Sequence, residues 1–175
     1  TATVVSAASD QSIAKGGNIT SIDLSSVFED ADNDTLTYSV SGNPTGVTLS
    51  GSTLSGSVPS TTGTHTMTLT ATDTDYASAT DTVVLTVTNT APTVSSAPSN
   101  ETVTGGTNIT SIDLSSVFTD ADGDSLTYTA TNYPDNLTFS SPTLSGSIPI
   151  TTTNQTFTIT LSASDGTDTT TTTVA

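Results

Sequence analysis

The sequence lacks cysteine and arginine altogether, and Lys15 is its only lysine. Without cysteine, the chain can form no disulfide, no thiolate nucleophile and no Cys-ligated zinc site. Nucleic acids and anionic membrane surfaces are bound through clusters of Lys and Arg, so neither is an expected partner. The 17 acidic residues then leave a formal net charge of −16, although only 10% of the residues are charged. The acidity therefore comes from missing bases rather than from an abundance of acids.

The groups needed for membrane insertion and for catalysis are also scarce. No apolar run approaches the ~20 residues that span a bilayer, so we expect no membrane insertion. His65 is the only histidine, which excludes a histidine metal cluster and leaves a Ser-His-Asp triad dependent on a residue in a Thr-rich stretch. The acidic residues gather in repeated loops, whereas glycoside hydrolysis places two carboxyl groups across a cleft. We therefore expect that the protein is not an enzyme.

The chain contains two copies of one unit. Residues 18–28 recur without change as residues 108–118, and the similarity continues at an offset of 90 and then, after a two-residue insertion, of 92. Self-similarity at a fixed period indicates repeated domains. The sequence predicts one domain over residues 1–90 and a second over residues 91–175, joined by a linker around residues 88–92.

Within each copy the apolar residues alternate with threonine. Examples are Met67, Leu69 and Ala71 in the first copy, and the run from Phe157 to Ala163 in the second. A period of two is typical of a strand with one buried face, and β-branched threonine suits the solvated face. No stretch has helical spacing. The pattern predicts an all-β protein made of two small β-sandwiches, whose modest cores would benefit from a metal ion as a staple.

The last strand of the second copy is short. The matching strand of the first copy runs to Thr88, whereas the second copy stops at Val174 and Ala175, about midway through. One interpretation is a chain boundary. The other is that a strand from a neighbouring subunit completes the sheet, as in donor-strand complementation, with residues 1–5 as the candidate donor.

Each copy carries an Asp-x-Asp-x-Asp loop. Asp30, Asp32 and Asp34 form the first, and Asp120, Asp122 and Asp124 form the second. Three carboxylates within five residues repel one another without a counter-ion, and Ca2+, which takes six to eight oxygen ligands, suits such an array. The positions that an EF-hand fills with Gly and Glu hold other residues, so the loop is not an EF-hand. The alternative is that Asp, Asn and Gly simply favour turns.

These motifs resemble those of cadherin-like domains, most closely the dystroglycan-type cadherin-like repeats of surface proteins. The segments that carry the resemblance are residues 118–128, residues 143–146, residues 161–166 and the linker at residues 87–92. The resemblance covers nearly the whole chain, twice. It implies two tandem cadherin-like or Ig-like Greek-key β-sandwiches, and a secreted or cell-surface location.

The resemblance also implies a set of Ca2+ ligands. Late-strand acids, Asp73 and Asp165, would join the acidic loops, Asn89 would assist at the linker, and Glu101 corresponds to the early glutamate of cadherins, where the first copy has Gln11. The linker lacks the family's acidic residues, so about one ion per unit is expected. The full predicted ligand set is Asp30, Asp32, Asp34, Asp73, Asn89, Glu101, Asp120, Asp122, Asp124 and Asp165.

Asparagine-linked glycosylation is possible at Asn-x-Ser/Thr sites in a secreted protein of a suitable organism. The chain has six such sites, of which Asn33 competes with the acidic loop. The remaining candidates are Asn18, Asn100, Asn108, Asn136 and Asn154.

Three functional hypotheses follow. The first is an extracellular structural or adhesion protein, in which Ca2+-stiffened modules form a surface stalk, adhesin or filament with neighbouring repeats or identical subunits. The second is a Ca2+-dependent module that binds cell-surface polysaccharide; the chain has no Trp, and only Tyr76 and Tyr133 are expected to be free. The third is a filament subunit that polymerises by donor-strand exchange.

Overall fold

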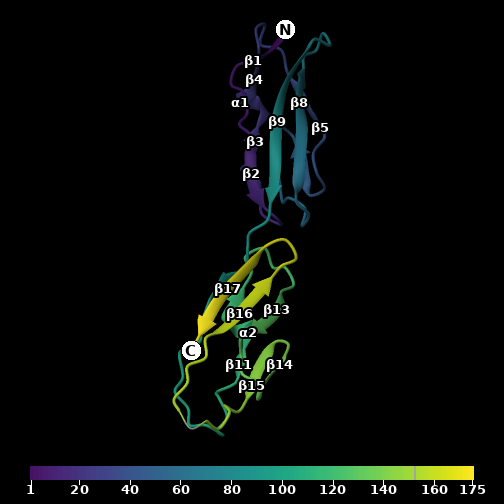
Figure 1. Ribbon diagram of the computed structural model, residues 1–175. Helices are drawn as coiled ribbons and strands as arrows, with labels where there is room; N and C mark the ends of the chain where they lie inside the picture. Colours follow the sequence, from purple (N-terminus) through teal and green to yellow (C-terminus); the bar gives the residue numbers. More distant parts are fainter. Residues whose placement is uncertain (152) are drawn as a thin grey trace. The chain divides into compact units, whose positions relative to one another are not determined.

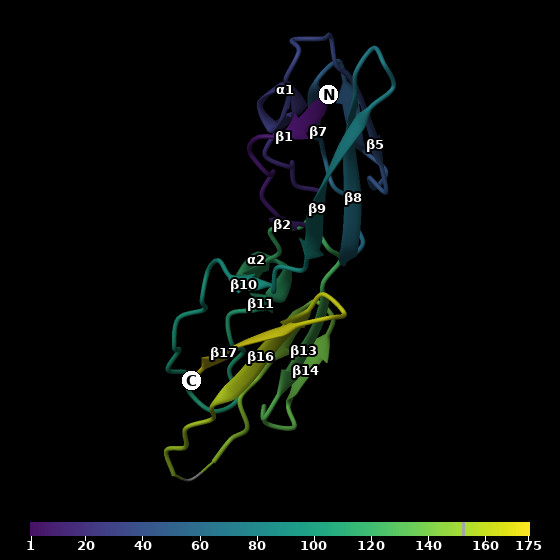
Figure 2. The same cartoon turned by 90° about the horizontal axis from the view of Figure 1, so that it is seen from above.

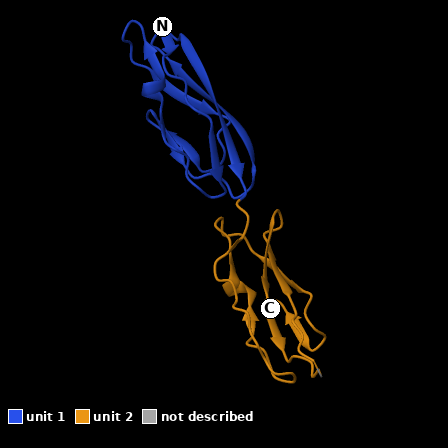
Figure 3. Ribbon diagram, turned by 60° about the vertical axis from the view of Figure 1, so that its left-hand side comes forward, with its two compact units in different colours: residues 1–89 blue, residues 90–175 orange. Residues whose placement is uncertain are grey.

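The computed structural model describes residues 1–151 and 153–175 of the chain (Figure 1). The chain divides into two compact units, Thr1–Asn89 and Thr90–Ala175 (Figure 3). Both units are built almost entirely from antiparallel strands, and each has its own hydrophobic core. The predicted all-β class is confirmed. In the described part of the chain, no helix has the length and apolar character required to cross a membrane.

The first unit contains a four-stranded sheet in the order β2-β9-β8-β5, a three-stranded sheet in the order β3-β7-β6, and the two-stranded pair β1-β4. The long hairpin of β8 and β9 is the largest element of this unit (Figures 1 and 2). The bounds are β1 Ala2–Val4, β2 Gln11–Ala14, β3 Ile22–Asp23, α1 Leu24–Val27, β4 Phe28–Asp30, β5 Thr37–Ser41, β6 Val47–Ser50, β7 Thr53–Gly56, β8 Gly63–Thr72 and β9 Ser78–Thr88.

The alternation seen in the sequence decides which side chains form this core. On β8 the alternate residues Met67, Leu69 and Ala71 are buried and the intervening threonines are more exposed. On β9, Leu85 and Val87 are likewise buried, with exposures of 0% and 2%. Leu54 and Val47 are among the buried residues that the three-stranded sheet adds to the same cluster. The period of two therefore places one face of each strand in the core.

The second unit repeats most of this arrangement, with shorter counterparts of β8 and β9 and without a strand at residues 101–104, the counterpart of β2. Its sheets have the orders β13-β16-β17 and β11-β15-β14, and β10 pairs with β12. The bounds are β10 Thr93–Val94, β11 Ile112–Asp113, α2 Leu114–Val117, β12 Phe118–Thr119, β13 Thr127–Thr131, β14 Leu137–Ser140, β15 Thr143–Gly146, β16 Ile159–Ser164 and β17 Thr169–Val174.

The two single-turn helices are a difference from the sequence prediction, which expected no helix. Asp23 caps α1 by accepting a hydrogen bond from the Ser25 amide at 3.0 Å, and Asp113 caps α2 through Ser115 at 2.9 Å. An N-cap carboxylate satisfies one of the amides that a helix start leaves free. Four residues are too few to show a 3.6-residue period, so the cap is the only local signal of these turns.

The N-terminal strand belongs to its own unit. Ala2, Thr3 and Val4 pair antiparallel with Asp30, Glu29 and Phe28, and Ala2 is 5% exposed. The prediction that residues 1–5 are a strand available to another subunit does not match this arrangement. The equivalent strand of the second unit, β10, pairs with β12 in the same way.

Candidate metal centre

The first acidic loop begins where β4 ends. One oxygen of Asp30, Oδ1, accepts hydrogen bonds from the amides of Asp32 at 2.8 Å and Asp34 at 3.1 Å. The chain can turn back in this way because Asn33 adopts a left-handed conformation with φ of 59°, which Asn tolerates better than most residues. The loop is thus folded around Oδ1 of Asp30, and Oδ2 of the same carboxylate accepts neither of these two amides.

The second unit builds the same loop. Asp120 Oδ1 accepts from the amides of Asp122 at 2.9 Å and Asp124 at 3.1 Å, and Gly123 takes the left-handed position with φ of 76°. In each unit, the three aspartates offer carboxylate oxygens that lie within 4.8 Å of one another. The sequence repeat therefore reproduces a three-carboxylate cluster as well as a fold.

A second loop, at the end of β8, provides a fourth carboxylate in the first unit. Asp73 Oδ1 accepts from the amides of Asp75 at 2.9 Å and Ala77 at 2.8 Å. Its side chain is 2% exposed, and that of Asp30 is 1% exposed. In the second unit, Asp165 Oδ1 accepts from the amides of Thr167 and Asp168, both at 2.7 Å. Each of these aspartates uses one oxygen to hold its own loop.

The remaining oxygens of the first unit surround a positive charge. The ammonium group of Thr1 lies 2.8 Å from Asp30 Oδ2, 3.1 Å from Asp32 Oδ2 and 3.6 Å from Asp73 Oδ2. β1 delivers it there because Ala2 pairs with Asp30. Two nearly buried carboxylates and one exposed carboxylate thus converge on one point.

The second unit presents the same carboxylates without an ammonium group. Asp122 Oδ2 accepts a hydrogen bond from the Thr90 amide at 2.7 Å. Asp120 Oδ2 is buried and accepts no hydrogen bond. A buried carboxylate oxygen without a hydrogen-bond partner is costly, and a cation at this atom would offset that cost.

The electrostatics of the first loop follow from the same geometry. Hydrogen bonding to Asp30, and then to Asp32, raises the pKa of the Thr1 ammonium to about 10. The ammonium in turn is the main cause that lowers the pKa of Asp30, with help from the Asp34 and Asp32 amides. Burial, followed by the negative charge of Asp30, raises the pKa of Asp34. A cation placed among these groups favours their ionised forms.

The donor set fits Ca2+. Carboxylate oxygens converge from two loops, and Ca2+ accepts six to eight oxygen ligands with flexible geometry. Asp30, Asp32, Asp34 and Asp73 would hold the ion in the first unit. Asp120, Asp122, Asp124 and Asp165 are the equivalent residues of the second unit. Of the ten predicted ligands, these eight lie in the acidic loops or at the start of the β8–β9 and β16–β17 turns.

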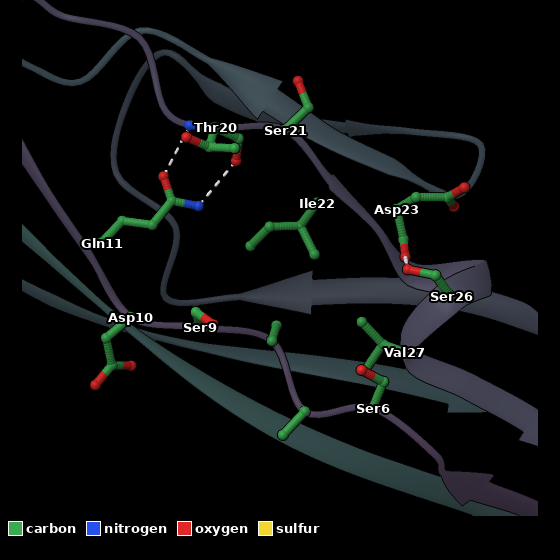
Figure 4. Close-up of a pocket in the computed structure, with 12 residues that line it drawn as sticks. Ser6, Ser9, Asp10, Gln11, Thr20, Ser21, Ile22, Asp23, Ser26 and Val27 are labelled. Carbon is green, nitrogen blue, oxygen red and sulfur yellow. Dashed lines mark hydrogen bonds between the residues drawn. The ribbon is translucent and has the colours of Figure 1, made fainter.

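The other two predicted ligands have different surroundings. Both carboxylate oxygens of Glu101 accept hydrogen bonds from Thr110, from its amide at 2.9 Å and from its hydroxyl at 3.1 Å. Its counterpart Gln11 bonds the amide and the carbonyl of Thr20, each at 2.8 Å (Figure 4). Residues 11 and 101 therefore hold the segments at Thr20 and Thr110 in place through hydrogen bonds. Glu101 is not part of the three-aspartate cluster. Asn89 is the last residue of the first unit, and its role as a ligand stays a prediction.

Sequence reasoning missed that residue 1 lies beside this cluster, because its position depends on the pairing of Ala2 with Asp30. It also missed the clamp made by residues 11 and 101, whose partners lie nine residues further along the chain.

The predicted glycosylation sites and aromatic residues can also be placed. Asn18, Asn100, Asn108, Asn136 and Asn154 are all exposed, and their glycosylation stays a prediction. Tyr76 is 89% exposed, as expected. Tyr133 is different: it is half-buried and packs against the second core, so the expectation that it is free was wrong.

The sequence matches a family of domains described as "Putative Ig domain" over residues 2–88 and again over residues 91–175. No curated protein matches the chain in sequence. Among solved structures, the titin domains Z1Z2 in complex with telethonin match 99% of this chain and 93% of that chain at 14% identity, with a TM-score of 0.53. This likeness shows the fold alone.

Two further structures match with lower TM-scores. An endo-fucoidan hydrolase, MfFcnA4 from glycoside hydrolase family 107, is 25% identical over 99% of this chain, with a TM-score of 0.41. This chain spans only 28% of the length of that hydrolase. Immunoglobulin domains 1–5 of Sidekick-1 match 99% of this chain and 40% of that chain at 12% identity, with a TM-score of 0.37.

Proposed function

The chain belongs to the family described as "Putative Ig domain", with two tandem immunoglobulin-like β-sandwiches, and from this premise we propose that it is a non-catalytic structural module of an extracellular stalk, adhesin or filament whose units are stiffened by Ca2+. The dystroglycan-type cadherin-like character of its motifs is part of this proposal. Neighbouring repeats or identical subunits are its proposed partners, and the cell surface or extracellular space is its proposed location.

The observation that carries the proposal is the cluster of three carboxylates in each acidic loop. In the first unit, the Oδ2 atoms of Asp30, Asp32 and Asp73 converge on one point. In the second unit Asp120 Oδ2 is buried without a hydrogen bond. Bound Ca2+ would supply the positive charge that neither unit obtains from Lys or Arg, and each ion would lower the magnitude of the −16 net charge by two.

Ca2+ would act on stability and on the loops rather than on a substrate. In the first unit it would bridge the Asp30 loop, which follows β4, to the Asp73 turn, which follows β8, and so hold two separate connections of the sandwich together. A ligand that binds the folded state alone raises the free energy of unfolding by mass action. The units are therefore expected to be more rigid and more stable with the ion than without it.

The test is a comparison of thermal unfolding with Ca2+, with Mg2+ and with EGTA. We expect Ca2+ to raise Tm, EGTA to reverse the rise, and Mg2+ to act more weakly because it demands a stricter octahedron. Isothermal titration calorimetry should find about one ion for the second unit. Identical unfolding curves in Ca2+ and EGTA would contradict the proposal.

The variant Asp122→Ala is expected to abolish the Ca2+-dependent part of the Tm in the second unit. Asp135→Ala is the matched control, since Asp135 is exposed and lies outside the three-aspartate cluster. It should leave the Ca2+ response unchanged. The acidic site is not the source of the stabilisation if both variants respond to Ca2+ like the unaltered chain.

Polysaccharide binding is the weaker alternative. Sugar-binding platforms usually present exposed aromatic rings, and Tyr76 is the one exposed aromatic residue in the described part of the chain. Tyr76 also has no counterpart in the second unit. A glycan array probed with and without Ca2+ distinguishes the hypotheses, because a spacer module binds no glycan under either condition.

A further inference from the structure

The strand β5 forms one edge of the four-stranded sheet of the first unit (Figures 1 and 2). It pairs antiparallel with β8 alone, from Thr37 opposite Thr72 to Ser41 opposite Thr68, without a bulge. In the described part of the chain, no backbone group outside β8 forms a hydrogen bond with the backbone of residues 37–41. The outer edge of β5 therefore presents a row of unpaired amide and carbonyl groups, which can template pairing with another strand.

The edge at β5 lacks the features with which natural proteins guard a sheet edge. Charged side chains, proline and bulges keep an edge strand from pairing with another chain, whereas β5 reads Thr-Tyr-Ser-Val-Ser. At the opposite edge of the sheet, β2 is flanked by Asp10 and Lys15. In the smaller sheet, β3 has two residues and includes Asp23, and the backbone of Val47 in β6 already bonds residues 43 and 44. The strand β5 is thus the longest and least guarded edge strand of the first unit.

The outward face of the sheet beside this edge carries no charge. Strand alternation turns residues 37, 39 and 41 of β5 away from the core, together with the even-numbered residues of β8 and β9. All of these outward residues are Thr, Ser or Val. The chain as a whole has a net charge of −16, so contacts between two copies are opposed wherever carboxylates face one another. At the β5 edge, two copies can meet through uncharged side chains.

Two apolar side chains lie along the inward face of the same edge. Tyr38 and Val40 are half-buried and pack against the core of the first unit. Only one side of β5 has a neighbouring strand, so a second neighbour would cover more of these two side chains. Aromatic and β-branched residues that lie opposite one another on adjacent strands stabilise a sheet. The edge therefore offers side-chain contacts in addition to main-chain hydrogen bonds.

We infer that β5 pairs with β5 of a second copy of this chain, antiparallel and centred on Ser39, so that the two four-stranded sheets join into one continuous sheet. Ser39 then lies opposite Ser39 of the second copy, and Tyr38 lies opposite Val40 of the second copy. The contact is self-complementary, as a closed two-fold dimer requires. It joins identical subunits, so the inference rests on that part of the proposed function.

The acidic residues favour the antiparallel orientation. Asp34 shortly precedes β5, and Asp73 directly follows Thr72, the residue of β8 that pairs with Thr37. Both acids therefore lie toward the Thr37 end of the edge, whereas the other end continues into residues 42–46, which are uncharged. Antiparallel pairing places each acidic end beside the uncharged end of the second copy. Parallel pairing would bring the two acidic ends together, and like charges that face each other oppose association.

The corresponding edge of the second unit provides a matched control. The strand β13 also pairs on one side only, with β16, and its sequence Thr-Tyr-Thr-Ala-Thr carries no charge. In the same register, Tyr128 of one copy would meet Ala130 of the other. Alanine buries less apolar surface than valine, so this pairing is weaker than that of Tyr38 with Val40. We therefore place the contact at β5 rather than at β13.

Sedimentation velocity of the complete chain, over a concentration series up to about 1 mM, tests for the dimer. We expect a reversible monomer–dimer equilibrium. Ser39→Glu places two like charges directly opposite each other and should weaken dimerisation by about tenfold or more, whereas Thr129→Glu, at the matching position of β13, should leave it unchanged. Both substituted residues are exposed, so circular dichroism should show that both variants are folded. A chain that stays monomeric throughout, or equal dimerisation of the two variants, would overturn the inference.

Disulfide formation reports the register, because the chain has no native cysteine. Ser39→Cys should cross-link to itself under mild oxidation, since facing residues on antiparallel strands have Cα atoms about 4.5–5.5 Å apart, within the range that a disulfide spans. Thr37→Cys should not, because residue 37 of the second copy would lie about 14 Å away. A mixture of Thr37→Cys and Ser41→Cys chains should cross-link, because these residues face each other. Cross-linking of residue 37 to itself but not of residue 39 would contradict the pairing.

The dimer should form equally in Ca2+ and in EGTA, because the contact uses no ion. A chain whose Tm responds to Ca2+ but that stays monomeric would contradict the edge pairing alone. A chain that dimerises through residue 39 without any response of Tm to Ca2+ would support the edge pairing and contradict only the Ca2+ part of the proposed function.

Discussion

At the scale of single residues, one carboxylate oxygen in each acidic loop has surroundings that an ordinary turn does not explain. Asp30 and Asp120 both use Oδ1 to accept two loop amides, which any Asx-type turn could explain. The Oδ2 atoms need a different explanation. One lies against an ammonium group and the other is buried without a hydrogen bond.

Asp23 provides a pH-dependent test at the same scale. Its carboxylate accepts hydrogen bonds from the Ser25 amide and the Ser25 hydroxyl. The pKa of Asp23 is lowered from 3.8, chiefly by the Ser25 hydroxyl and then by that of Ser52. A lowered pKa means that the ionised form stabilises the folded state above the unfolded-state value, and that this contribution is lost as the pH falls through the folded-state value.

We therefore expect Asp23→Asn to be less stable than the unaltered chain near neutral pH, and the difference to shrink as the pH falls below about 4. Urea unfolding of both proteins across this range measures the difference. Asn retains an acceptor for the helix cap but cannot titrate. A gap that stays constant down to about pH 2 would show that ionisation of Asp23 does not contribute.

At the scale of elements, the strand alternation predicted the sheets well where both neighbours of a strand are present. Met67, Leu69 and Ala71 lie on the buried face of β8, as expected. Phe157 has the same alternation in the sequence, yet β16 begins only at Ile159. Periodicity reports which face a strand would bury, whereas pairing depends on a partner strand, and residues 155–158 have none among the described residues.

The cores of the two units can be tested with a matched pair of substitutions. Leu69 and Leu161 occupy equivalent places and are both 0% exposed. Leu→Ala at a fully buried site removes apolar contacts and leaves a cavity, with a typical cost of about 2–5 kcal/mol. Leu69→Ala should lower the stability of the first unit and Leu161→Ala that of the second.

Hydrogen exchange followed residue by residue checks this expectation. Each substitution should speed exchange in the β-sheet amides of its own unit and leave the other unit unchanged, because each leucine belongs to a separate hydrophobic cluster. A substitution that speeds exchange equally in both units would mean that the two cores unfold as one.

At the scale of the whole molecule, the exact repeat of residues 18–28 predicted two similar units, and the family matches over residues 2–88 and 91–175 agree with two Ig-like repeats. The sequence also indicated where the second unit differs, at its short last strand. The consequences of that difference were not predictable from a linear pattern. The counterparts of β2 and of the start of β8, residues 101–104 and 155–158, form no strand.

The surroundings of the acidic loops could also be predicted only in part from the sequence. The spacing of Asp30, Asp32 and Asp34 predicted a cluster, and the structure places their carboxylates together. No pattern in the sequence indicates that Thr1 is delivered to this cluster, because that depends on the pairing of Ala2 with Asp30. The pairing of residues 2 and 30 therefore decides that residue 1 lies beside the cluster.

The parallel pairing of β2 with the end of β9 has a mechanical consequence. If tension is applied at the two ends of the first unit, β2 is pulled toward one end and the last residues of β9 toward the other. The four paired positions, from Gln11 with Leu85 to Ala14 with Thr88, are then loaded in shear and must break together instead of unzipping one by one. Forced unfolding is governed by the barrier to unfolding, and this pair raises it.

Because proline cannot donate a hydrogen bond to a strand ladder, Ile13→Pro within β2 should lower the force at which single-molecule pulling unfolds the first unit. Equal unfolding forces for this variant and the unaltered chain would show that the β2–β9 pair does not bear the load. With a lowered force in the variant, the pairing of these two short segments would set the tension that the first unit withstands.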